Sequence, residues 1–279
     1  MAYFVQGVIL TQTLWRKNLH PLVFVVVLTA LVSRADIAGI PLPPALLGNA
    51  GPLQGETLNY YKNAAGYLAE PQGAGSHGSV ILIHEWNGLT DRVREVADAM
   101  AAEGYIALAA DLFSSRTGSN PGENMALVRE TLADPETLIA NLNAAVRYLN
   151  NRSDSTGKVA AIGWCYGGGV ALSFALGGIQ HEATAIFYGR ILDDPEQLEK
   201  IDHEVYGTFA GQDRSIPVEM VNQFVAALRT AGVPNDVHIY DSVNHGFWLH
   251  VDANPDLRSG PALDAWSRLK RYLARTIEG

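Results

Sequence analysis

A glycine-flanked cysteine, Cys165, is the feature that most constrains this chain. An apolar run over residues 158–162 precedes it and a helix-compatible stretch begins at Val170, so Cys165 lies on a sharp strand-to-helix turn. Backbone N–H groups at a helix N-terminus favour thiolate over thiol, which makes this side chain a candidate nucleophile. Free cysteines are also often small buried apolar residues, and glycine turns often serve packing. The sequence fits neither common phosphate-loop pattern, so the turn alone leaves catalysis and packing open.

Composition excludes several classes of protein. The chain has 279 residues, of which 48% are hydrophobic, enough to bury one sizeable core. Its formal charge of −9 and the lack of any block of Lys or Arg argue against nucleic-acid binding. Cys165 is the only cysteine, which excludes an intrachain disulfide. We expect a monomer that has no nucleic-acid partner.

The N-terminus has the layout of an export signal. Arg16 and Lys17 precede a largely apolar run over residues 22–32, and small residues then flank a possible cleavage site after Ala35. The apolar run is shorter than the ~20 residues of a comfortable transmembrane helix. We therefore expect residues 1–35 to be a signal peptide and the protein to be exported, either periplasmic or secreted. The alternative is an uncleaved signal anchor, which would hold the protein at a membrane.

The rest of the chain predicts a linker and one α/β domain. Residues 36–55 are rich in proline and glycine and are expected to be the linker, and residues 56–279 the domain. Short apolar runs alternate with helical patterns, which indicates a parallel sheet covered on both faces. The nucleophile turn favours an open, doubly wound sheet over a closed barrel. Strands are expected at 56–62, 66–70, 79–83, 105–110, 158–162, 183–188, 205–210 and 237–240, and helices at 90–103, 134–150, 217–231 and 262–277, with a further helix after Cys165.

Two more candidate residues follow predicted strands. Asp213 lies in the loop after strand 205–210, and His245 lies after the last strand. The chain order nucleophile, acid, histidine is that of α/β-hydrolases, in which the histidine takes the proton and the acid orients the imidazole. Each residue alone is more often a turn or surface residue. Their joint order and placement favour a catalytic triad.

The loop after the first core strand begins His84-Glu85-Trp86. In this fold the equivalent loop supplies one of two oxyanion N–H donors, so the backbone N–H groups of Trp86 and Tyr166 are the candidates. His84-Glu85 begins like a zinc-protease motif, but no second histidine follows at the needed spacing, so we expect no metal. Glu85 is either a solvated loop charge or a carboxylate coupled to the thiol.

The complete pattern resembles the dienelactone hydrolase family. The resemblance implies an α/β-hydrolase fold, no cofactor, and a Cys165–His245–Asp213 triad. It also implies that Glu85 pairs with the resting thiol and swings away when substrate binds. Acyl transfer to Cys165 and hydrolysis of the thioester would follow; family members open the lactone ring of dienelactone (the carboxymethylenebutenolidase reaction). The segments that carry it are 66–71, 83–89, 110–113, the Cys165 turn, 211–213 and 244–247.

One departure from the family bears on the substrate. Dienelactone-specific members bind the substrate carboxylate with two arginines. Arg116 is a candidate for the first, but no arginine follows His245 where the second is expected, and Arg258 lies further along. The sequence therefore predicts a small neutral ester or lactone, bound in an aromatic pocket to which Phe247 and Trp248 would contribute. For these two residues core packing is an equal alternative.

The alternatives for the whole protein are a general carboxylesterase on neutral esters and a non-catalytic binding protein of the same fold. The intact triad favours an enzyme.

Overall fold

Six parallel strands form the centre of the fold, and most of their side chains are buried. The computed structural model describes residues 41–278, to which the statements below refer. Apolar runs form the inner strands because helices on both faces of a parallel sheet leave no solvent side for polar residues. At the carboxyl edge Ile83 pairs with Ala110 and with Gly163, so the loops that follow these three strands meet. The strands are β3 (His77–Ile83), β4 (Ile106–Ala110), β5 (Ser155–Trp164), β6 (Ala183–Phe187), β7 (Val205–Ala210) and β8 (Asn235–Tyr240).

Two antiparallel strands extend the sheet at one edge. β1 (Glu56–Tyr61) and β2 (Ala64–Ala69) form the predicted hairpin, and β2 pairs antiparallel with β4. The strand order is β1-β2-β4-β3-β5-β6-β7-β8, which confirms the doubly wound sheet. The chain leaves β3 toward β4 on one side and reaches β5 on the other, so the strand order reverses at β3. Ligand sites of open sheets lie at the carboxyl ends of the strands at such a point.

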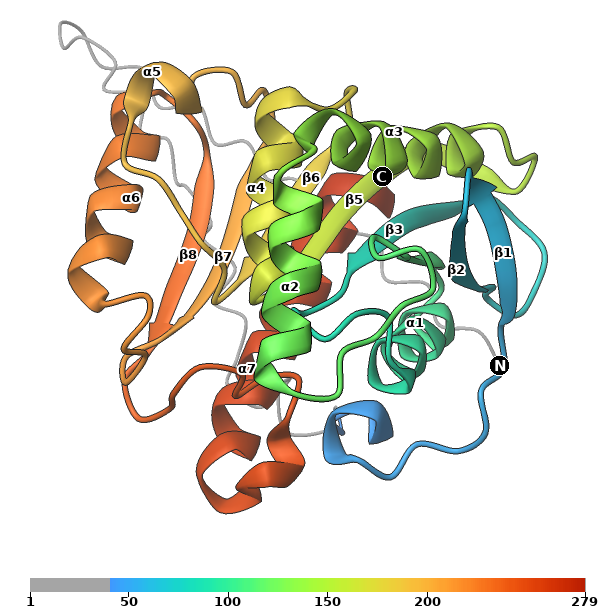
Figure 1. Ribbon diagram of the computed structural model, residues 1–279, viewed down its shortest axis with the longest axis horizontal. Helices are drawn as coiled ribbons and strands as arrows, with labels where there is room; N and C mark the ends of the chain where they lie inside the picture. Colours follow the sequence, from blue (N-terminus) through green and yellow to red (C-terminus); the bar gives the residue numbers. More distant parts are fainter. Residues whose placement is uncertain (1–40, 279) are drawn as a thin grey trace, which may run out of the picture. The chain divides into compact units, whose positions relative to one another are not determined.

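Helices cover both faces of the sheet. α1 and α7 share one apolar cluster, which contains Val96 and Trp266, whereas α3 and α4 share a second, which contains Leu142 and Phe174. Figure 1 shows α4 crossing in front of the strands and α7 behind them. The helices are α1 (Asp91–Ala102), α2 (Pro121–Leu132), α3 (Pro135–Asn150), α4 (Tyr166–Gly177), α5 (Pro195–Leu198), α6 (Val218–Thr230) and α7 (Pro255–Leu273), with short turns η1 (Pro44–Leu47), η2 (Val251–Ala253) and η3 (Ala274–Glu278).

Helix α2 is absent from the sequence-based expectations. Its start is well specified, because the Asn120 side chain accepts hydrogen bonds from the backbone N–H groups of Gly122 and Glu123, both at 3.1 Å, and Pro121 occupies the first turn. Its apolar stripe is short, with Leu127 as the buried apolar residue, so the helical period is hard to recognise in the sequence.

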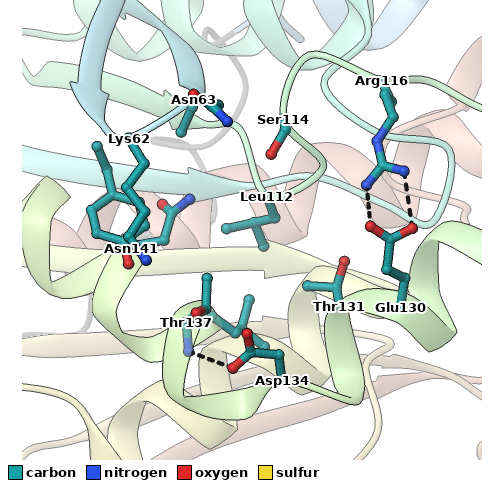
Figure 2. A pocket seen from close by; sticks show the side chains of 13 residues that line it. Lys62, Asn63, Leu112, Ser114, Arg116, Glu130, Thr131, Asp134, Thr137 and Asn141 are labelled. Carbon is teal, nitrogen blue, oxygen red and sulfur yellow. Dashed lines mark hydrogen bonds and ion pairs between the residues drawn. The ribbon is translucent and has the colours of Figure 1, made fainter.

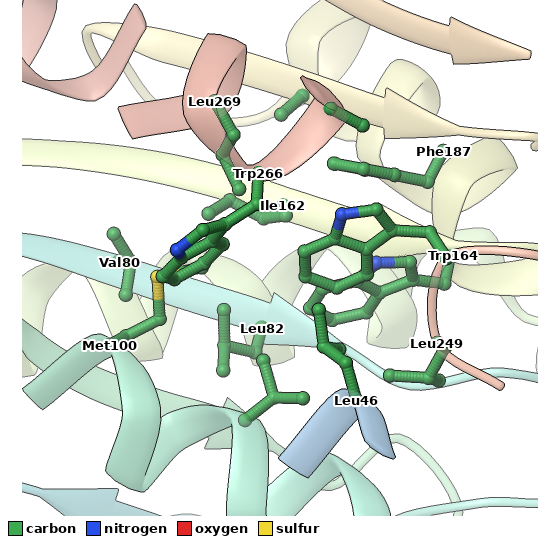
Figure 3. Close-up of a cluster of buried hydrophobic side chains, with 14 of the residues drawn as sticks. Leu46, Val80, Leu82, Met100, Ile162, Trp164, Phe187, Leu249, Trp266 and Leu269 are labelled. Atoms are coloured by element: carbon green, nitrogen blue, oxygen red, sulfur yellow. The ribbon is translucent and has the colours of Figure 1, made fainter. Parts of the chain in front are cut away.

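Part of the predicted linker packs on the domain. η1 buries Ala45 and Leu46, and Leu46 belongs to the same apolar cluster as Trp164. Figure 3 shows Leu46 among the core side chains below the ring of Trp164. Fully burying a leucine stabilises a fold by about 1.5–3 kcal/mol. This stabilisation explains why the segment packs on the domain although its proline-rich composition is typical of a linker. The folded domain therefore begins before residue 56.

The expected signal peptide or anchor, residues 1–35, lies outside the described residues. Within residues 41–278, none of the helices combines the length and the apolar character needed to cross a membrane.

Candidate active site

Cys165 occupies the turn between β5 and α4. Its backbone has φ 54° and ψ −115°, a conformation that an L-residue adopts only where its surroundings enforce it. A Cβ atom on Gly163 would lie 2.0 Å from the carbonyl oxygen of Gly167, and one on Gly167 would lie 2.1 Å from that of Ile83. The glycines therefore allow the turn to pack directly against its own strand and against the end of β3. Cys165 is half-buried at the carboxyl edge of the sheet.

Asp213 and His245 meet at the same edge. The Asp213 Oδ2 atom lies 2.6 Å from His245 Nδ1. Its other oxygen, Oδ1, accepts hydrogen bonds from the backbone N–H groups of Ser215, at 2.8 Å, and Ile216, at 3.3 Å. The carboxylate is thus fixed in orientation, and the predicted acid and histidine are brought together.

The charges of this pair depend on each other. Burial alone would lower the pKa of His245, but the hydrogen bond that it donates to Asp213, with the hydrogen bond and charge of Cys165, raises it to about 10. Burial would raise the pKa of Asp213, but the His245 bond and two backbone N–H groups hold it below its ordinary value. Because Nδ1 bonds Asp213, Nε2 is the nitrogen that faces Cys165. His245 is therefore an imidazolium at neutral pH, with the Asp213 carboxylate on one side and Cys165 on the other.

The backbone offers donors for a developing oxyanion. Among the backbone hydrogen bonds of turns and loops within residues 41–278, none has the Trp86 N–H or the Tyr166 N–H as its donor. Tyr166 is the first residue of α4, whose N–H groups lack intrahelical acceptors, and Trp86 lies in the turn closed by the bond from Gly88 N to Glu85 O, at 3.2 Å. This arrangement is compatible with the predicted oxyanion hole.

Glu85 has a partner that the sequence does not predict. Its Oε2 atom lies 2.8 Å from Nε2 of His250, and the residue is only 7% exposed. Glu85 therefore pairs with a histidine, and the pairing with the resting thiol that the resemblance implies stays a prediction. The loop that carries Glu85 packs against the Cys165 turn, since a Cβ atom on Gly167 would lie 2.5 Å from the carbonyl oxygen of His84. Burial raises the pKa of Tyr188 well above its ordinary value, and the charges of Glu85 and Cys165 raise it further.

His84 supports the loop rather than a metal. Its Nε2 accepts from the backbone N–H of Leu112 at 3.3 Å, so Nδ1 carries the proton and donates to the Glu85 carbonyl oxygen at 2.7 Å. Burial lowers the pKa of His84, which keeps the ring neutral. Both nitrogens are therefore engaged by the main chain, and the ring also contacts Phe113 with a centroid distance of 4.6 Å. In the sequence, the position of His84 directly after a core strand is the one feature that could have predicted its bonds to the loop backbone.

Arg116 does not join the triad. Its guanidinium binds both oxygens of Glu130, at 2.9 and 2.6 Å, and its side chain is 48% exposed (Figure 2). Ser114 and Ser115 have φ of 53° and 63°, and this left-handed bend leads the chain toward α2. Arg116 lines a polar cavity of about 230 Å³ that Cys165 does not line. Its expected role in binding a substrate carboxylate is not supported by these contacts.

Phe247 and Trp248 are core residues, which corrects their expected place in a substrate pocket. Both are 0% exposed. The Trp248 ring stacks on Trp164 with a centroid distance of 5.6 Å and an interplanar angle of 14°, and the Phe247 ring lies 5.3 Å from that of Tyr240. They follow His245 closely in sequence, so their burial anchors the loop that carries it.

Comparison with known proteins is consistent with this geometry. The profile of the dienelactone hydrolase family matches residues 64–277. A protein of Methylorubrum extorquens is 27% identical over 220 residues, which cover 74% of this chain and 75% of the relative. One of Synechocystis sp. is 29% identical over 231 residues, with coverage of 77% and 92%. Both are named "Putative carboxymethylenebutenolidase".

Solved structures share the fold. A dienelactone hydrolase-like promiscuous phosphotriesterase from metagenomic libraries has a TM-score of 0.72 at 21% identity, covering 80% of this chain and 98% of that one. A thermophilic esterase of Thermogutta terrifontis has a TM-score of 0.56 at 16% identity, covering 80% and 94%. Because the family match spans most of the domain, the chain belongs to the dienelactone hydrolase family and is a hydrolase that acts on esters or lactones.

Proposed function

We propose that this enzyme hydrolyses small neutral esters or lactones through a thioester formed on Cys165. One observation carries the proposal: the thiol lies on a turn of positive φ beside His245, whose other nitrogen bonds Asp213 at 2.6 Å. This is the arrangement that nucleophilic catalysis requires, with nucleophile, base and orienting acid in contact.

In the first half-reaction the Cys165 thiolate attacks the substrate carbonyl carbon. The oxyanion that forms accepts hydrogen bonds from the Trp86 and Tyr166 N–H groups. As the tetrahedral intermediate collapses, the bond to the ester oxygen breaks and the His245 imidazolium protonates the leaving alkoxide. In a lactone that alcohol stays attached to the acyl group.

The second half-reaction needs His245 as a base. Cys165 raises the pKa of His245 through a hydrogen bond and through its charge. Both contributions disappear once the sulfur is acylated, so the pKa of His245 falls and the neutral imidazole takes a proton from water. The resulting hydroxide attacks the thioester, and the thiolate leaves to restore the imidazolium–thiolate pair.

The charges around the site favour a neutral substrate. The charge of Arg116 is compensated by Glu130, and the sequence has no arginine at the place expected after His245. Arg258 is engaged by the Asn244 side chain and the His250 carbonyl oxygen, at 2.8 and 2.6 Å. A substrate carboxylate would also meet the buried Glu85 near the thiol, and like charges in a poorly solvated site repel.

A hydrolysis assay with a fluorogenic short-chain ester tests the proposal. We expect Cys165→Ala to lower kcat/KM by at least about a thousandfold, because the nucleophile is lost while the fold is kept. Rapid acid quench of the wild-type enzyme with a slow ester should yield protein carrying one acyl group that hydroxylamine removes. Equal rates for the two proteins, or an acyl group found elsewhere than on Cys165, would refute the thioester mechanism and leave the binding-protein alternative.

A further inference from the structure

We propose that His250 is a positioning residue that holds the Glu85 carboxylate away from Cys165, so that the thiolate–imidazolium pair exists before substrate arrives. The inference rests on the proposed role of Cys165 as the nucleophile. It assigns the resting partner of Glu85 to a histidine, and it removes the need for substrate to displace the carboxylate.

The contact itself is specific. The Glu85 side chain is 9% exposed and that of His250 is 41% exposed, so a buried carboxylate is satisfied by an imidazole that reaches in from the solvent side. The two atoms, Glu85 Oε2 and His250 Nε2, are 2.8 Å apart. A buried carboxylate without a partner is strongly unfavourable, so this bond determines where the Glu85 side chain lies.

The main chain around His250 is held from several sides. Arg258 of α7 donates through Nη1 to the His250 carbonyl oxygen at 2.6 Å. Arg92 of α1 donates to the Leu249 carbonyl oxygen at 2.9 Å, and the Leu249 N–H donates to the Tyr188 hydroxyl at 3.3 Å. The main chain at His250 is therefore held by three other parts of the fold, and the bond to Glu85 orients its imidazole.

The surroundings of Glu85 make its position matter for the thiol. Tyr188 is fully buried, has φ 38°, and is close enough to both Glu85 and Cys165 to feel their charges. A second anion that approaches Cys165 disfavours the thiolate. Once released from His250, the Glu85 carboxylate would remain in the loop that packs against the Cys165 turn, where its charge can act on the sulfur.

Other charged groups face this region and enter the pH dependence. Arg258 acts on Tyr188, and the pKa of Asp252 in η2 is lowered mainly by the bond from Arg92, at 2.9 Å, and also by the nearby His250. His245 and Asp213 face the thiol from the loops after β8 and β7. All of these stay in place in the variants described next, so differences between variants report the Glu85–His250 contact.

Alkylation of the single cysteine by iodoacetamide measures the thiolate fraction of Cys165 without ester turnover. We expect His250→Ala to slow alkylation about tenfold near neutral pH and to move the pH–rate midpoint upward by about one unit, because the released carboxylate approaches the sulfur. His250→Gln, which keeps an N–H donor, should restore the wild-type rate, and so should the double change Glu85→Gln with His250→Ala. His77→Ala, at the opposite end of β3, is the matched control and should leave the rate unchanged.

The opposite pattern would overturn the proposal. If Glu85→Gln alone accelerates alkylation while His250→Ala does not change it, the carboxylate pairs with the thiol in the resting enzyme. If neither His250→Gln nor the double change restores the rate, His250 acts on the fold rather than through Glu85. The expected alkylation pattern in a protein that forms no acyl-thioester would refute the proposed function and leave the role of His250 intact.

Discussion

Two histidines at opposite ends of β6, the half-buried His245 and the buried His181, have opposite charge states. At the carboxyl end His245 is held by Asp213 and Cys165, and its pKa is raised to about 10 despite burial. At the amino end burial lowers the pKa of His181 to about 4, and the Ile179 carbonyl oxygen, 3.0 Å from Nδ1, offsets this only partly.

The difference shows what a fold must supply to keep an imidazole charged. Both rings are at least partly removed from water, which disfavours the charged form in each. Only His245 has a buried carboxylate as its direct partner, whereas His181 has a carbonyl oxygen and the Thr184 hydroxyl, at 3.0 Å. The amino end of β6 is therefore a neutral hydrogen-bonded network that stabilises the fold, and the carboxyl end is a charged one able to move protons.

The largest effect is expected when the Asp213 carboxylate, the anion that keeps His245 charged, is removed. We expect Asp213→Asn to lower kcat/KM by about 10³–10⁴, because the imidazole loses both its orientation and the charge that stabilises its protonated form. The ring proton resonances of His245 should titrate at a lower pH than in the wild type. Asp241→Asn, in the exposed loop after β8, is the matched control. A loss below tenfold would show that Asp213 is not the orienting acid.

Lowering the pH should reduce the free energy of unfolding, because His181 is buried in its neutral form. The pKa of His181 is lower in the folded chain than the ordinary 6.5, so the unfolded chain binds more protons between these values. Stability is therefore complete above about pH 6.5 and is lost as the pH falls toward 4, by about 3 kcal/mol from this residue. Urea unfolding at a series of pH values measures the loss, and His181→Gln should flatten it. An equally steep loss in the variant would assign the acid sensitivity to other groups.

The smallest effect is expected for an exposed pair. Arg116 and Glu130 have side chains that are 48% and 61% exposed, and such pairs contribute about 0–1 kcal/mol. Arg116→Ala should therefore change the unfolding free energy by less than about 1 kcal/mol and leave kcat/KM for a neutral ester unchanged. A large selective loss on an anionic substrate would restore Arg116 as a substrate-binding residue and sharpen the contrast between buried and exposed charges.

The sequence predicts what is local or repeated. The strands from β3 to β7 are apolar runs that fit only a sheet buried on both faces, and the ends of β5, β7 and β8 place Cys165, Asp213 and His245 at one edge. Chain order and strand ends together therefore predict the triad contacts, even though 32 residues separate Asp213 from His245.

What the sequence does not predict depends on tertiary packing. Glu85 and His250 are 165 residues apart, and their contact requires the segment after β8 to be held by α1 and α7. Arg116 meets Glu130 only because α2 exists and two serines bend the loop toward it. Phe247 and Trp248 follow the catalytic histidine, so a pocket and a core role are equally compatible with their sequence positions, and burial decides between them.

The glycine contacts of the Cys165 turn have a consequence for how this enzyme can diversify. Gly163 and Gly167 touch main-chain atoms, so no change of rotamer elsewhere can make room for a side chain at either position. The spacing between the turn and the end of β3 is thus fixed by backbone contacts, and substitutions of core side chains do not change it. New substrate ranges must come from exposed positions of the loops after β4 and β6, and a library that randomises those positions samples variation while the turn, Tyr188 and the loop that carries His245 are kept.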